Sequence, residues 1–375
     1  MRPGVQRVYG FLHRHLIWCL LLVYALGTLG PPGSGWLDAG SGTALGSRWP
    51  LRLLLSVILF NAGLGVALEQ LRHVGRHWQL LAAGWIAGIV LPMTLVVVAG
   101  LFLAWHQLPQ EYLVLLVGFA VVAAMPVAGA SAAWAQNAEA NLALSLGLVL
   151  LSTLASPLST AAVLALTASW LAGDVVGPIG GAPHTTAWFL ALWVVAPAVA
   201  GLGARVGLGT ARVEHMKPYL KLINLAALLL LYYLNAALTL PEVLAFQSVT
   251  VIATAVAGAA ALAAAVFLGS ELLARGFRAE RPERASLLFG LALKNNGAAM
   301  VLVSTVLGSQ ELALLPILAY SLAQNVGAAM VDRWVPVVGD GERALPPQDV
   351  VAAEGPGAVY GSTGPDPASD DSGTA

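Results

Sequence analysis

The chain has 375 residues, of which 58% are hydrophobic and only 10% are charged. A soluble domain carries about 25% charged residues, so most of this chain is expected to lie in a lipid bilayer. The formal net charge of −1 gives no indication of nucleic-acid binding. The single cysteine, Cys19, excludes an intrachain disulfide and a metal site built from cysteines.

Apolar segments long enough to cross a bilayer follow one another along the chain. The first, residues 16–29, follows a basic start that is also typical of a signal peptide, but no clear cleavage site comes after it. We therefore interpret it as a retained first helix. The other predicted spans are residues 50–68, 80–105, 112–136, 141–171, 187–206, 219–240, 244–274, 285–308 and 312–335.

Lysines and arginines are distributed very unequally between the two sides of these ten spans. Nearly all of those in the connecting segments fall on the side of the N-terminus, and only Arg48 and Arg52 fall on the other side. This asymmetry predicts a multi-pass protein of the cell (inner) membrane with both termini in the cytoplasm.

A Gly- and Pro-rich linker at residues 172–186 separates five predicted spans from five others. An odd number of spans in each half forces opposite orientations, which is the inverted-repeat plan of many secondary transporters. We therefore predict an all-α membrane protein with ten transmembrane helices in two inverted five-helix repeats, residues 1–171 and 187–335. Residues 336–375 are rich in Gly, Pro, Ser and Asp, which predicts a disordered cytoplasmic tail.

The fourth span of each half contains an interruption. In the first half it runs from Met125 to Ser131 and includes Pro126 and Gly129, and in the second it is Lys294-Asn295-Asn296-Gly297. Because a broken span leaves backbone groups unpaired, it is tolerated only where those groups line a cavity or meet protein partners. At such a break, the N-terminal end of one half-helix suits an anion, and the carbonyls at the C-terminal end of the other suit a cation. We predict that the broken fourth and ninth helices cross at the transport site. The alternative is an ordinary proline kink in which Ser131 bonds back to a carbonyl.

Lys294 lies near the middle of an apolar run from residue 285 to residue 307. A lysine at mid-depth costs about 2.5–3.5 kcal/mol on insertion scales, so it needs a partner or a water-filled cavity. The alternative is a lysine near a span end that extends to the lipid headgroups.

Other polar residues within the predicted spans are more typical of interhelical hydrogen bonds than of ligands when taken singly. They are Asn61, Asn224, Asn235, Gln324 and Asn325. Asn61 and the pair Gln324-Asn325 are the stronger candidates for a site.

Three stretches of the chain resemble the bile acid:sodium symporter superfamily. They are Ala62 to Leu71, Pro126 to Thr160 and Gly290 to Val303. The resemblance implies a ten-helix inverted-repeat fold and a secondary transporter, not an enzyme, that moves a small organic anion by alternating access.

The chain departs from the sodium-coupled members of this superfamily at the positions that would bind the ion. Their ninth-helix Gln-Asn-Ser-Gly is replaced by Lys294-Asn295-Asn296-Gly297, although Ser145 keeps one expected hydroxyl. Positions that carry other sodium ligands correspond here to Gly290, Ala132, Val149 and Ala87. These departures predict a sodium-independent member without a metal or cofactor, in which the Lys294 ammonium occupies the place of sodium. Lys294 would then support proton coupling or uniport, or pair directly with the substrate.

The predicted substrate and ion site comprises Lys294, Asn295, Asn296, Gly129, Ser131, Pro126, Ser145, Asn61, Gln324 and Asn325. The expected partners are a small organic anion and the lipid bilayer. The alternatives are a sodium-coupled symporter of the same family, an auxin-efflux-type carrier and an intramembrane hydrolase with a Ser131–Lys294 dyad. The sequence leaves the substrate, the coupling ion and the oligomeric state open.

Overall fold

The structure is a computed structural model that describes residues 10–12, 15–29, 48–66, 69, 74–170, 183–306 and 311–334. The chain divides into a compact unit, Met1–Val337, and a second unit, Val338–Ala375, which lies entirely outside the described residues. The predicted tail and most of the predicted linker, residues 172–182, also lie outside them.

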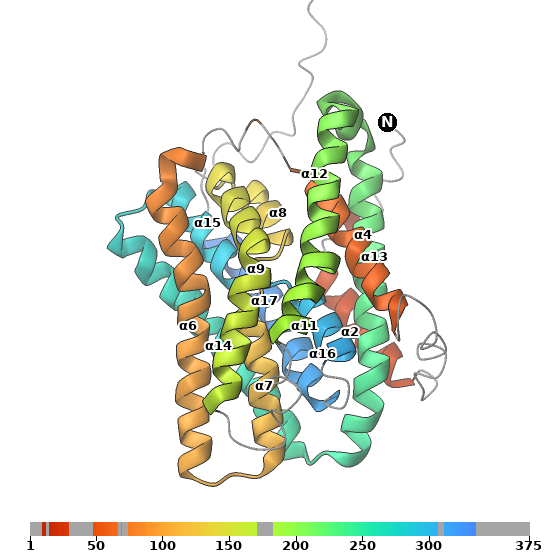
Figure 1. Ribbon diagram of the computed structural model, residues 1–375, viewed down its shortest axis with the longest axis vertical. Helices are drawn as coiled ribbons and strands as arrows, with labels where there is room; N and C mark the ends of the chain where they lie inside the picture. Colours follow the sequence, from red (N-terminus) through yellow and green to blue (C-terminus); the bar gives the residue numbers. More distant parts are fainter. Residues whose placement is uncertain are drawn as a thin grey trace, which may run out of the picture. The chain divides into compact units, whose positions relative to one another are not determined.

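The first unit is built from helices, and the described residues contain no β-strand (Figure 1). This confirms the predicted all-α class. The helices are α2 (Leu16–Leu29), α4 (Trp49–Leu64), η1 (Val74–His77), α6 (Trp78–Trp105), α7 (Gln110–Ala124), α8 (Ala130–Asn137), α9 (Leu142–Trp170), α11 (Pro183–Leu190), η2 (Ala191–Val195), α12 (Ala196–Leu208), α13 (Thr210–Phe246), α14 (Val249–Gly276), α15 (Arg281–Ala292), α16 (Asn296–Val306), η3 (Glu311–Ala313) and α17 (Leu314–Trp334).

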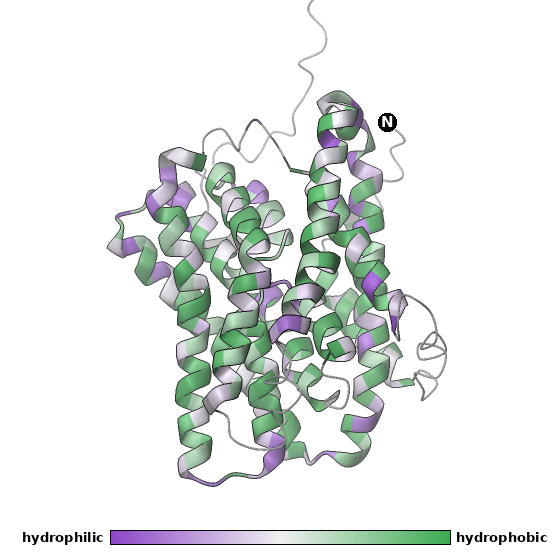
Figure 2. Cartoon of the chain, in the orientation of Figure 1, coloured by the Kyte–Doolittle hydropathy of each residue, from purple (hydrophilic) through white to green (hydrophobic). Residues whose placement is uncertain are grey.

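Within the part of the chain that the structure describes, six helical segments are long and apolar enough to cross a membrane. They are Trp78–Trp105, Leu142–Ser169, Pro183–Leu208, Thr210–Phe246, Val249–Gly276 and Leu314–Val331. Four shorter apolar helices are α2, α4, α7 and α16. Figure 2 shows hydrophobic residues along the middle of α6 and α14, with hydrophilic residues concentrated near helix ends. Exposed side chains such as Val98, Leu101 and Leu268 contribute to this apolar exterior, which suits contact with lipid.

Several helix boundaries differ from the prediction. Helix α13 continues to Phe246, through the predicted gap at residues 241–243 and into the segment predicted as the next span. Helix α11 begins at Pro183, inside the segment expected as linker, because proline is well suited to the first position of a helix. Helix α13 begins at Thr210 and continues through Pro218, where the prediction started a new span at Tyr219. A Lys217–Glu214 pair at 3.1 Å lies one turn apart on this polar extension and stabilises it.

Helices α4 and α12 lie in backbone contact. A Cβ atom added to Gly63 would lie 2.0 Å from the carbonyl oxygen of Ala198, and one added to Gly201 would lie 2.0 Å from that of Phe60. The two glycines therefore allow an approach that any larger residue would prevent. This contact fixes two of the helices that line the pocket described below.

Candidate functional site

The two interruptions predicted from the sequence meet in the structure. Val127 and Lys294 form an isolated antiparallel bridge. The backbone N–H of Ala128 donates to the carbonyl of Leu293 at 2.8 Å, and the N–H of Asn295 donates to the carbonyl of Pro126 at 2.9 Å. We call Met125–Gly129 and Leu293–Asn295, joined in this way, the crossing.

Local sequence explains why each helix stops at the crossing. Met125 has an extended conformation, with φ −66° and ψ 148°, as expected for a residue that precedes proline. In the second segment of the crossing, Leu293 is also extended, and α15 ends directly before it. Helix α16 then starts at Asn296, and the side-chain oxygen of Asn295 accepts a hydrogen bond from the N–H of Ala298 at 3.1 Å.

Side chains from neighbouring helices pair with the open backbone groups of the crossing. Gln324 accepts from the N–H of Lys294 at 2.9 Å and donates to the carbonyl of the same residue at 3.4 Å. The hydroxyl of Ser152 accepts from the N–H of Val127 at 3.0 Å. The hydroxyls of Thr160 and Tyr320 donate to the last carbonyls of α7 and α15, at 2.7 and 2.9 Å. The crossing is thus an ordered element held by its surroundings.

The Lys294 side chain is 2% exposed, and its ammonium donates to two backbone carbonyls. One is the carbonyl of Gly88 in α6, and the other is that of Met125 at 3.4 Å. The carbonyl of Gly88 is available because Pro92, four residues further along α6, has no N–H to donate to it. The alternative of a lysine that extends to the headgroups does not fit this burial.

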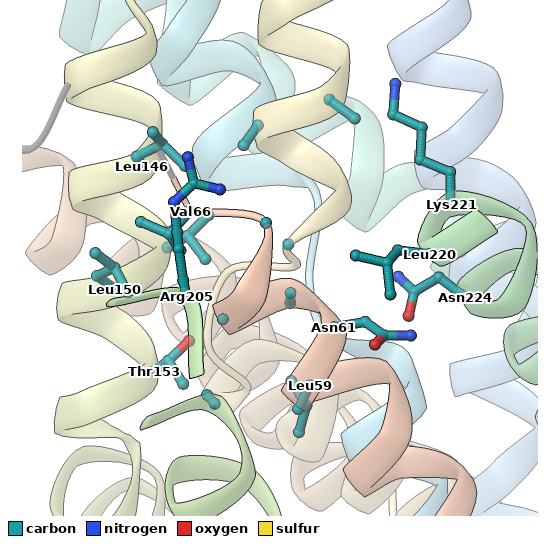
Figure 3. Close-up of a pocket in the computed structure, with 18 of the residues that line it drawn as sticks. Leu59, Asn61, Val66, Leu146, Leu150, Thr153, Arg205, Leu220, Lys221 and Asn224 are labelled. Atoms are coloured by element: carbon teal, nitrogen blue, oxygen red, sulfur yellow. The ribbon is translucent and has the colours of Figure 1, made fainter. Parts of the chain in front are cut away.

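A pocket of about 240 Å³ reaches the crossing at residues other than Lys294 (Figure 3). Val127, Gly129 and Asn295 of the crossing line it, whereas Lys294 is not among its lining residues. The rest of the wall comes from α4, α8, α9, α12 and α13. Polar lining residues are Asn61, Gln136, Thr153, Arg205, Glu214, Lys217, Lys221 and Asn224. The pocket is thus a space for a ligand that touches the crossing without contacting the buried ammonium.

The remaining predicted site residues divide into two groups. Ser131, Ser145 and Asn296 are at most 1% exposed, and their side-chain polar atoms have no hydrogen-bond partner. Ser131 therefore does not bond back to a carbonyl, as the proline-kink alternative required. Asn325 instead donates to Ser321 in its own helix at 2.7 Å, and this bond does not reach the crossing. Asn61 lines the pocket, where its side-chain N–H₂ group has no partner.

Comparison with known families decides the class of this protein. The model of the sodium bile acid symporter family matches residues 52–246, which is more than half of the chain. The chain belongs to this family. The matched segment includes the first interruption and ends before Lys294. No curated protein matches the chain closely enough to name a relative.

Membership in the sodium bile acid symporter family makes the protein a membrane transporter and not an enzyme. The geometry agrees, since the ammonium of Lys294 is bonded to carbonyls while the hydroxyl of Ser131 has no partner. The Ser131–Lys294 hydrolase alternative is therefore wrong.

One position where relatives are expected to carry a sodium ligand is closely packed here, so that a larger side chain would require Leu148 to shift. A Cβ atom added to Gly290 would lie 2.7 Å from a methyl group of Leu148. The carboxylate that the resemblance places at this position is thus replaced by the packing of α9 against α15. Glycine supplies no side-chain oxygen at this position.

The site predicted from the sequence did not include Tyr320, Thr160 or Arg205. Tyr320 lies one helical turn before Gln324, so both face the crossing from α17, and this spacing is a signal that the sequence contains. Arg205 lies near the end of a predicted span, where an arginine is typical of a membrane boundary.

Proposed function

We propose that the protein is a sodium-independent secondary transporter of a small organic anion, working by alternating access around the crossing. In this proposal the Lys294 ammonium takes the place that a sodium ion fills in relatives. The observation that carries the proposal is that a buried ammonium, and not an open cavity, lies against the carbonyls of Gly88 and Met125.

The pair of carbonyls supports a cation-like role for Lys294. Carbonyls at the end of a broken helix, such as that of Met125, are suited to a monovalent cation, and the carbonyl of Gly88 has no N–H partner in α6 because of Pro92. Here an ammonium fixed to the chain satisfies them, and no carboxylate of the described residues forms an ion pair with it. The close packing of Gly290 against Leu148, where the resemblance places a carboxylate, supports the same proposal. A transporter whose internal cation is part of the chain has no need of a sodium gradient.

Charge around the pocket supports an anionic substrate. Arg205, Lys217 and Lys221 line the wall, against a single lining carboxylate, Glu214. In addition, α8 and α16 begin at the crossing, so the positive ends of both helix dipoles point toward it. The positive charge of the pocket wall and of the two helix ends favours the binding of a small organic anion.

The proposal includes the ten-helix, inverted-repeat plan with both termini in the cytoplasm. Each of the ten predicted spans contains a helix in the part that the structure describes, and in this proposal α7/α8 and α15/α16 are the interrupted span of each half. The excess of Lys and Arg on the N-terminal side supports this orientation in the cell (inner) membrane.

The experiment is uptake of a panel of radiolabelled carboxylates into proteoliposomes, with and without a sodium gradient and a pH gradient. The proposal expects uptake of at least one carboxylate that does not respond to sodium. A response to the pH gradient would assign proton coupling to the transporter, and no response would assign uniport. Uptake that requires sodium would refute the proposal and favour the sodium-coupled alternative.

A further inference from the structure

Arg205 is a buried cation in the pocket wall with unused hydrogen-bonding capacity. It lies near the end of α12 and is 2% exposed (Figure 3). Its Nη1 donates to the carbonyl of Leu64, the last residue of α4, at 3.2 Å. Its Nε has no hydrogen-bond partner. A buried donor without a partner is uncommon and costly. The free Nε therefore indicates that a bound ligand accepts a hydrogen bond from it.

The free group lies on the edge of the guanidinium that is best suited to a carboxylate. Nε and Nη2 point in parallel from one side of the plane and can donate to both oxygens of a carboxylate at once. The nearest carboxylate, Glu214, has its oxygen 3.9 Å from Nη2, which is too long for a hydrogen bond. Lys217 holds that carboxylate at 3.1 and 3.3 Å. Glu214 is therefore a neighbour of the edge that does not occupy it.

We propose that the Nε–Nη2 edge of Arg205 is the subsite that binds the carboxylate of the substrate, and that Glu214 opposes this binding by its charge. The apolar body of the substrate would then lie along Leu59, Leu146 and Leu150, toward the crossing. This inference rests on the proposed function and deepens it. It assigns the anionic group of the substrate to Arg205 and leaves Lys294 as the internal cation.

Binding to the purified protein in detergent tests this assignment without any transport step. The probe is 4-phenylbutyrate, and its uncharged amide is the control ligand of the same shape. The midpoint of thermal unfolding is measured against probe concentration, since a ligand that binds only the folded state raises it. We expect the carboxylate to stabilise the wild-type protein and the amide to have little effect. Equal effects of the two ligands would overturn the proposal.

Two variants give changes of opposite sign. Arg205→Lys keeps the charge but loses the paired edge, so the apparent Kd for 4-phenylbutyrate should rise at least tenfold. Glu214→Gln removes the opposing charge, so the apparent Kd should fall. Arg212→Gln, an exposed arginine of α13 that does not line the pocket, should change nothing. Wild-type affinity in Arg205→Lys, or weaker binding in Glu214→Gln, would overturn the proposal. If Arg205→Lys does not fold, Glu214→Gln still decides.

The assay separates this inference from the proposed function. Lys294→Met should bind the probe like the wild-type protein while losing transport. Normal transport in Lys294→Met, together with a strong effect of Arg205→Lys on binding, would refute the proposed function and leave the subsite standing. Loss of probe binding in Lys294→Met would instead place the carboxylate at Lys294 and refute the subsite.

Discussion

The backbone carbonyl of Gly88 in α6 accepts a hydrogen bond from the ammonium of Lys294 in the crossing, although the two residues lie far apart in the sequence. Pro92 leaves that carbonyl without a partner in its own helix. The ammonium of Lys294 thus donates to the backbone of α6 and to the broken end of α7.

Pro92→Ala is expected to impair transport. Alanine supplies an N–H that competes for the carbonyl of Gly88 and weakens its bond to Lys294. A hydrogen bond to a charged group is worth about 1.5–3 kcal/mol. If the rate-limiting conformational change of alternating access depends on this bond, the initial rate of uptake should fall by roughly ten- to a hundredfold. Pro241→Ala, the same change in α13 away from the pocket, should leave the rate unchanged. A normal rate in Pro92→Ala would contradict this role of the proline.

Gln324→Leu is expected to destabilise the protein. The amide of Gln324 pairs with both the N–H and the carbonyl of Lys294, so leucine leaves a buried donor without a partner. The expected loss is about 1–3 kcal/mol. Thermal unfolding in detergent measures it. The matched control is Asn325→Leu, since Asn325 bonds only within α17 and its replacement should cost less. Equal losses in the two variants would show that the bond to the crossing is not what Gln324 contributes.

Gly290→Ala is expected to overpack the contact between α15 and α9. The added methyl group would meet Leu148 at 2.7 Å, and such overpacking costs about 1–3 kcal/mol. Adding Leu148→Ala should relieve the clash, so the double variant should be more stable than the sum of the two single changes predicts. Gly203→Ala, where nothing lies within 4 Å of the added atom, is the control and should be neutral or slightly stabilising. Strict additivity of the first two changes would contradict the packing account.

The crossing could be predicted from the sequence because a proline and a polar run stand inside otherwise apolar segments. Pro126 and the run that begins at Lys294 interrupt apolar segments at matching places in the two halves. The partners of Lys294 could not be predicted in the same way, because they are backbone carbonyls and no side-chain type marks them. Only Pro92, inside a predicted span, indicates a free carbonyl in advance.

The pocket was harder to predict than the crossing. Its basic residues lie on α12 and near the start of α13, and of these only Lys217 falls in the segment that was predicted to be a loop between spans. Arg205 and Lys217 were therefore counted as topology signals, and their place in a pocket wall follows only from how α12 and α13 pack against α4. Ser131, Ser145 and Asn296 remain predicted site residues, since they are buried without partners at the positions where they were expected.

Uptake by wild-type and Lys294→Met protein in sodium-free proteoliposomes tests the central claim most directly. Methionine matches the length of the lysine stem and removes only its charge and donors. The account predicts that the wild-type protein transports its carboxylate equally well with and without sodium, and that Lys294→Met does not transport it in sodium-free buffer. Sodium-dependent uptake by the wild-type protein, or wild-type rates in Lys294→Met, would contradict it.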